Sequence, residues 1–122
     1  MLAMQEPLIS TNAEVAVSVN DIIALDVTID DIRKGKRCKA NECAIALAAR
    51  RLFPNHYIRV GKSLRLWTNE SAFQRWFNEL QPEFREEPIK FSLGEIGEKF
   101  RDEFDDAKPN LQPQTLVLLR LS

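Results

Sequence analysis

The feature that most constrains the fold is an unbroken apolar run from Cys43 to Ala49, in which four of the seven residues are alanine. A helix that is apolar on every side and built from small residues must be buried and closely packed. Asn41 is expected to cap this helix at its N-terminus. Arg50 and Arg51 suit its C-terminal end, where cations are favoured, and Pro54 ends it. The rest of the chain must therefore supply a core around one thin helix.

Period-two alternation of apolar residues predicts strands over 14–19, 22–28 and 89–93. The segment "TLVLLRL", residues 115–121, is apolar enough to form a central strand or to lie at an interface. Asn20–Asp21 is a weaker hairpin signal than Asn-Gly, so pairing of the first two strands is left open.

Capping boxes and helical spacing predict three further helices. Thr28 and Asp31 form the first box, before a short helix that ends at Gly35. Asn69 caps a second helix, which ends at Pro82. The third runs from "SLGE" to about residue 106. The apolar residues expected to face inward on the last two helices are Phe73, Trp76, Phe77, Leu80, Ile96, Phe100 and Phe104.

These elements predict a single α+β domain over residues 1–122, with a mostly antiparallel sheet and three to four helices packed against it. The apolar final segment also favours a homo-oligomer.

Residues 57–67, "YIRVGKSLRLW", read as a β-hairpin whose loop length follows from register. A two-residue loop would mix apolar and charged side chains on both faces. A three-residue "GKS" loop sets Ile58 opposite Leu66 and gives one clean apolar face. It also sets Arg59 opposite Arg65, an unfavourable like-charge pair that calls for a partner.

Charge is strongly segregated along the chain, although the net charge is only −1. Residues 1–32 hold six acids and no Lys or Arg, residues 33–69 hold ten bases against one acid, and residues 70–122 hold eleven acids and seven bases. A cluster of one sign attracts the opposite sign whatever the net charge. The basic middle either binds an anionic partner or is neutralised by the acidic ends folding back.

The hairpin face is the sharper candidate for an anion site. Arg59 and Arg65 could hold a phosphate, Lys62 would add charge at the tip, and Tyr57 or Trp67 could stack on a base. The alternative is that acids of the 95–106 helix cover this face and pair with the arginines. A second basic cluster, in the loop "RKGKR", fits an anion contact or a solvated turn; its residues are Arg33, Lys34, Lys36 and Arg37.

The sequence indicates no catalytic or metal centre. Cys38, Cys43 and His56 match no recognised zinc spacing, and two cysteines make no disulfide framework. The single histidine has no partners for a nucleophilic triad, and no glycine-rich phosphate loop is present. We therefore expect a non-enzymatic protein without metal or cofactor. The lack of a long apolar stretch and of a signal peptide favours a cytoplasmic location without membrane association.

The chain resembles a family of small proteins found in bacterial and bacteriophage genomes. The residues that carry the resemblance are "LDVTIDDIRKG", "CAIALAARRLFP", "IRVGKSLRLW", "AFQRWF" and "EEPIKFSLGEI", in order over about residues 25 to 96. Ala44 stands where the family usually has proline, and residues 97–122 form a C-terminal helix–strand extension. The resemblance implies an accessory protein, often carried by mobile elements, in the cytoplasm of a bacterial host. It assigns no functional residue.

Two functions follow as hypotheses. The first is a binding protein that uses the basic surface of residues 33–65 for a phosphate-bearing partner, nucleic acid or nucleotide. The second is a protein-binding inhibitor, such as a phage anti-defence factor (anti-CRISPR-like or signal-sequestering), directed at a host protein.

Overall fold

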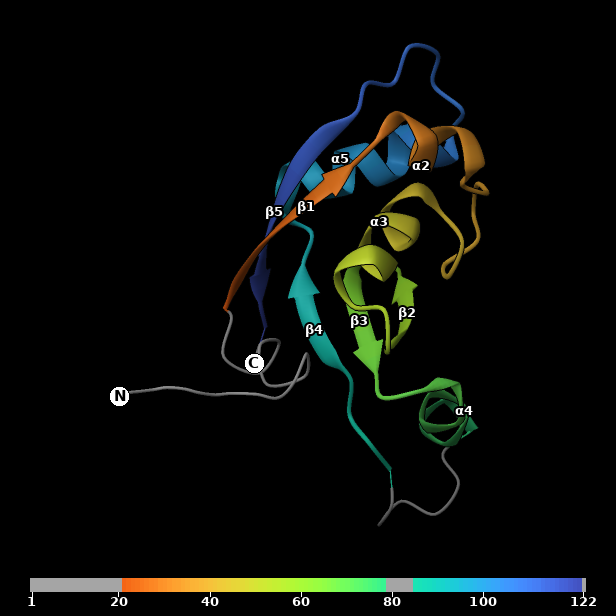
Figure 1. The fold of residues 1–122 in the computed structure, drawn as a ribbon, viewed down its shortest axis with the longest axis vertical. Coiled ribbons are helices and arrows are strands. Elements are labelled where there is room, and N and C mark those ends of the chain that lie inside the picture. Colours follow the sequence, from red (N-terminus) through yellow and green to blue (C-terminus); the bar gives the residue numbers. More distant parts are fainter. Residues whose placement is uncertain (1–20, 79–84, 122) are drawn as a thin grey trace, which may run out of the picture.

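Five antiparallel strands form one sheet in the order β1-β5-β4-β3-β2, in a computed structural model that describes residues 21–78 and 85–121 (Figure 1). The strands are β1 (Ile22–Val27), β2 (Tyr57–Val60), β3 (Ser63–Trp67), β4 (Ile89–Ser92) and β5 (Gln114–Arg120). The helices within these ranges are α2 (Ile29–Lys34), α3 (Ala44–Leu52), α4 (Glu70–Asn78) and α5 (Gly94–Asp105). The predicted α+β class is confirmed. The strand expected over 14–19 lies outside the described residues, as do Leu80 and Pro82.

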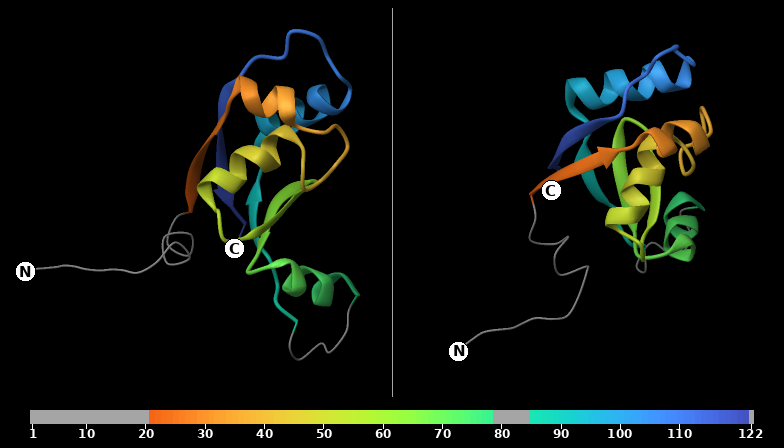
Figure 2. Two further views of the ribbon diagram at one scale, coloured as in Figure 1. Left: turned by 45° about the vertical axis from the view of Figure 1, so that its right-hand side comes forward. Right: turned by 45° about the horizontal axis from the view of Figure 1, so that its top comes forward.

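Three helices cover one face of the sheet and build the core there, as the views in Figure 2 show for α2, α3 and α5. The alanines of α3 are at most 2% exposed, which confirms that this helix is buried. Its N-cap is Cys43, and not Asn41 as the sequence suggested. The reason is a turn before the helix, in which the amide of Cys43 donates to the carbonyl of Lys39 at 2.9 Å. The carbonyl of Asn41 instead accepts a hydrogen bond from Arg50.

The predicted capping box of α2 is confirmed, with Thr28 and Asp31 bonded in both directions. The helix ends at Gly35, but the glycine has an ordinary φ of −66°. Close packing is what requires glycine there. An added Cβ would lie 2.7 Å from the backbone nitrogen of Ala44 and 3.0 Å from the ring of Phe104.

The C-terminal segment is central to the fold and not appended to it, because β5 lies between β1 and β4. The capping box predicted for α5 is absent: the N-cap is Leu93, and the hydroxyl of Ser92 accepts from the amide of Gly94. Phe100 is buried as predicted, whereas Ile96 is 68% exposed. Leu93, one helical turn before Ile96, is the residue whose side chain is buried instead.

The hairpin has the predicted register, with Ile58 opposite Leu66 and Arg59 opposite Arg65. Its apolar face joins the core under α3. Helix α4 packs on the opposite, outer face, against Trp67. The predicted cap of α4 is confirmed, since the Asn69 side chain accepts from the amide of Ala72 at 2.8 Å. No helix in the described ranges has the length and apolar character required to cross a bilayer.

Candidate anion-binding site

Three cationic side chains stand in one row on the outer face of the sheet. Arg59 on β2 lies directly opposite Arg65 on β3, and Arg65 lies directly opposite Lys90 on β4. Cross-strand partners project from the same face of a sheet, so the three side chains share one surface. The sequence predicted the first pair, whereas Lys90 was not singled out because its strand partner was unknown.

Aromatic rings of α4 and β3 lie beside the arginines. The guanidinium carbon of Arg59 is 4.8 Å from the ring centre of Phe73. That of Arg65 is 5.6 Å from the ring of Trp76 and 5.9 Å from that of Trp67. Such cation–π contacts are worth about 0.5–2 kcal/mol each. They offset part of the repulsion between the arginines while leaving their charge in place.

Of the two aromatic residues predicted to stack on a ligand, Trp67 is inaccessible, whereas the prediction for Tyr57 stays a prediction. Trp67 is fully buried, 4.8 Å from the ring of Phe73 and 5.3 Å from that of Trp76. Tyr57 is half-buried against Phe73, and its hydroxyl accepts from Arg59 at 3.3 Å. Alternation assigned both to the correct face but could not show that α4 covers it at this end. The prediction of base stacking on Trp67 is therefore wrong.

The paired arginines line an open cavity together with Arg85 and three aromatic residues of α4. This arginine–aromatic pocket has a volume of about 390 Å³ and is lined by Arg59, Arg65, Arg85, Phe73, Trp76 and Phe77. The guanidinium of Arg85 lies 5.3 Å from the ring of Trp76, so three guanidinium groups meet one cluster of rings. Phe77 is 64% exposed at the pocket. Sequence reasoning assigned Trp76 and Phe77 to the core and missed Arg85.

Two of these three arginines, Arg59 and Arg65, keep a positive charge that is uncompensated within the described structure. Within the described residues, no carboxylate pairs with Arg59 or Arg65. The nearby acid is Glu87, which lies 3.3 Å from Arg85 and accepts from Trp76 Nε1 at 3.3 Å. Among the described residues, the lining of the pocket therefore carries three guanidinium groups, with the Glu87 carboxylate beside one of them.

The acids of α5 lie on the other side of the sheet, and two of them form ion pairs there. Asp102 pairs with Arg101, and Glu103 pairs with Lys108 at 2.8 Å. The hydrogen bond from Lys108 holds the pKa of the Glu103 carboxyl below its usual value. The alternative in which this helix neutralises the hairpin arginines is thus not realised in the described structure.

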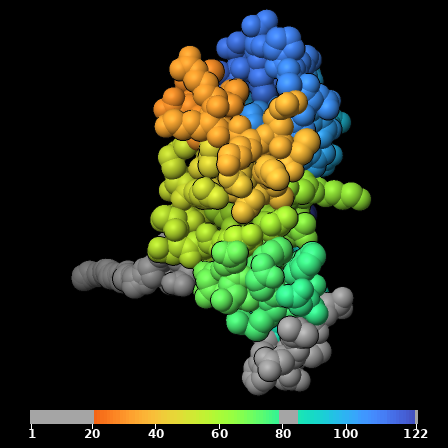
Figure 3. Space-filling model, turned by 90° about the vertical axis from the view of Figure 1, so that its right-hand side faces the viewer, coloured from red at the N-terminus to blue at the C-terminus, as the bar shows by residue number. Residues whose placement is uncertain are grey.

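The second basic cluster lies apart from the arginine–aromatic pocket. Arg33 and Lys34 end α2, Lys36 pairs with Glu42 at 3.1 Å, and Arg37 lines a separate cavity beside α5. In Figure 3 the loop after α2 (orange-yellow) and α4 (green) are separated by α3 and the hairpin. The surface of residues 33–65 predicted as one basic face is therefore divided in two.

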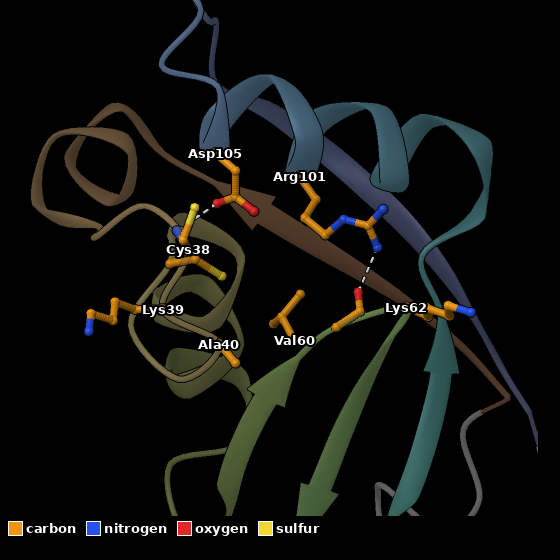
Figure 4. Close-up of a pocket in the computed structure, with 9 residues that line it drawn as sticks. Cys38, Lys39, Ala40, Val60, Lys62, Arg101 and Asp105 are labelled. Atoms are coloured by element: carbon orange, nitrogen blue, oxygen red, sulfur yellow. Dashed lines mark hydrogen bonds between the residues drawn. The ribbon is translucent and has the colours of Figure 1, made fainter.

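Lys62 belongs to neither group, because it borders a third cavity of about 340 Å³ between the hairpin tip and α5 (Figure 4). Both cysteines line this cavity. Cys38 is exposed, and its amide donates to Asp105 at 2.9 Å. Burial, with a smaller effect of Asp105, raises the pKa of the Cys43 thiol. Figure 4 shows the Lys62 side chain extending away from the cysteines. Arg101 and Asp105 of α5 also line this cavity, but both are already bonded to the protein, Arg101 to the carbonyl of Gly61 and Asp105 to the amide of Cys38.

His56 lies elsewhere, with its ring 6.1 Å from that of Phe53. Across the described part of the chain, no three His, Cys, Asp or Glu side chains are grouped to hold a metal ion. The arginine–aromatic pocket is therefore the best-developed candidate site.

No family model, curated protein or solved structure matches this chain. The resemblance based on residues 25 to 96 stays a prediction.

Proposed function

We propose that the protein binds, without catalysing a reaction, a phosphate-bearing ligand with an aromatic base, a nucleotide or nucleic acid, in the arginine–aromatic pocket. One observation carries the proposal: Arg59 and Arg65 lie side by side at a cavity with no carboxylate of the described residues bonded to either. Like charges directly opposite each other in a sheet are destabilising. An anion placed between them converts that cost into affinity.

The pocket offers both kinds of contact that a nucleotide requires. Guanidinium groups bind phosphate oxygens bidentately through charge-assisted hydrogen bonds. Trp76 and the exposed ring of Phe77 provide faces on which a base can stack. A volume of about 390 Å³ lies within the usual range for small-ligand sites.

The test is a calorimetric titration of the full chain with thymidine monophosphate, ATP and oligothymidylate, for wild type and for the double variant Arg59→Gln, Arg65→Gln. Wild type should bind at least one of these probes, and the double variant should lose at least tenfold in affinity, because each charged hydrogen bond contributes about 1.5–3 kcal/mol. The matched control, Lys99→Gln on α5, removes one charge from the opposite side of the sheet. Absence of binding to every probe at tens of micromolar protein contradicts the proposal.

The second candidate is a protein-binding role, favoured by an exposed aliphatic strip on the outer face of β1 and β5. Ile22 opposes Leu119 and Ala24 opposes Val117, and the three larger side chains are 54–62% exposed. Contiguous exposed apolar side chains mark protein contacts. A host protein as the target would suit the accessory role that the sequence resemblance implies.

The occupant of this strip that can be tested directly is a second copy of the chain. Sedimentation velocity should then show a dimer, and Val117→Lys should give a folded monomer. If the wild-type chain is monomeric and binds nucleotides, dimerisation through this strip is rejected and nucleotide binding remains the proposed function.

A further inference from the structure

The row of cations extends beyond the arginine–aromatic pocket. Lys90 lies next to Arg65 on the far side from Arg59, and among the described residues it forms no ion pair. Neighbouring strands are about 4.8 Å apart, so the row covers roughly 10 Å of the sheet. It contains two like-charge cross-strand pairs in succession, where one is already unfavourable.

The surface beyond Lys90 is open and continues across the sheet. Ser63 lies opposite Ser92, and Ser92 lies opposite Leu119, which is 54% exposed. Ser63 and Ser92 share the outer face with Lys90, because they lie two residues along their strands from Arg65 and Lys90. Leu119 shares that face as the cross-strand partner of Ser92. The helices α2, α3 and α5 pack on the other face (Figure 2). A ligand that leaves the pocket along this face therefore meets charged, hydroxyl and apolar side chains in turn.

We infer that the ligand is a single-stranded polynucleotide that crosses the strands from the arginine–aromatic pocket toward Lys90 and β5; this inference depends on the proposed function. A nucleoside triphosphate concentrates its negative charge in one place, so the guanidinium groups of the pocket would bind it without Lys90. A polynucleotide carries one charge per nucleotide, which matches one cation on each of three adjacent strands. A duplex does not fit, because its paired bases are not free to stack on Trp76 and Phe77.

The experiment measures the affinity of the full chain for thymidine nucleotides of increasing length, from the monophosphate to a decamer, over a range of salt concentrations. Affinity for the decamer should exceed that for the monophosphate by at least about tenfold, because added bases and phosphates add contacts. Lys90→Gln should weaken decamer binding and reduce the salt slope by about 0.7, the value for one phosphate contact on a single strand. It should leave monophosphate binding unchanged.

Two variants show whether a loss arises from charge or from misfolding. Lys90→Arg keeps the charge and should keep the wild-type slope, whereas Lys99→Gln removes a charge from α5 and should change neither affinity. Equal affinity for monophosphate and decamer, an unchanged slope in Lys90→Gln, or tighter binding of a duplex overturns the inference while the pocket function stands. Absence of binding to any thymidine nucleotide or to ATP rejects the proposed function as well.

Discussion

Arg51 holds the buried carboxylate of Asp31 with both of its terminal nitrogens, and Nη2 lies 2.7 Å from Oδ2. The same carboxylate accepts from the amide of Thr28, and Arg51 also donates to the carbonyl of Asp26 at 2.9 Å. The end of α3 is thereby joined to the end of β1 and the start of α2. Asp31 is only 3% exposed, so its charge depends on these partners.

This ion pair makes stability sensitive to acid. Burial opposes ionisation of Asp31, but the hydrogen bonds from Arg51 and Thr28 outweigh it and hold the pKa of the carboxyl below its ordinary 3.8. A carboxyl whose pKa is lower in the folded than in the unfolded chain contributes stability above the unfolded value, and this is lost as pH falls through the folded value. Urea unfolding from neutral pH to below about pH 3 should therefore show the difference between wild type and Asp31→Asn shrinking with acid. A difference that is constant with pH would contradict this role.

Gly35 should tolerate no side chain. Gly35→Ala places a Cβ 2.7 Å from the backbone nitrogen of Ala44 and 2.7 Å from the carbonyl oxygen of Asp31, neither of which can move alone. Overpacking of this kind costs about 1–3 kcal/mol in the free energy of unfolding. Thermal or urea unfolding measures it, and Lys34→Ala, an exposed position on the same helix, should change stability by less than about 0.5 kcal/mol. Equal stability of the two variants would mean that α2 and α3 are less tightly packed.

The two tryptophans should respond differently to ligand. Trp76 lines the arginine–aromatic pocket, whereas Trp67 is fully buried beneath it. A base that stacks on an indole quenches its fluorescence, so oligothymidylate should quench wild type and Trp67→Phe. Trp76→Phe should lose most of that change. Quenching that survives in Trp76→Phe and disappears in Trp67→Phe would place the ligand elsewhere.

The cysteines should differ in reactivity toward an aromatic disulfide reagent. Cys38 is exposed, whereas Cys43 is 5% exposed and burial raises its pKa. Because the thiolate is the reactive form, one thiol should react quickly in the folded protein and the second only after unfolding. Cys38→Ser should abolish the fast reaction with little effect on stability. Cys43→Ala is the control that keeps the fast reaction.

Local signals in the sequence predicted part of the local structure, although the cap expected at Asn41 and the capping box expected before α5 were wrong. The box at Thr28, the cap at Asn69 and the hairpin register each depend on residues a few positions apart, and all three are confirmed. Alternation also placed Arg59 and Arg65 correctly on one face.

The remaining features depend on which elements meet, and this cannot be deduced from spacing. Trp67 alternates like an outward-facing residue and is buried only because α4 covers it. Lys90 joins the cationic row only through the pairing of β3 with β4. Arg85 reaches Trp76 from a separate segment that no periodicity describes. The sequence therefore predicted the arginine pair of the candidate site, but not Lys90 or Arg85.

The central position of β5 has a consequence for how the molecule comes together. Its neighbours β1 and β4 do not pair with each other, so the sheet is two fragments until this late segment inserts between them. Contacts between residues distant in sequence slow folding, since a long loop must close before they form. On a ribosome, α2 and α3 can cover the inward leucine and valine side chains of β1 early, but its backbone has no partner among the described strands until β5 is made. Until β5 is synthesised and paired, β1 and β4 therefore each present an unpaired strand edge, a feature that favours aggregation.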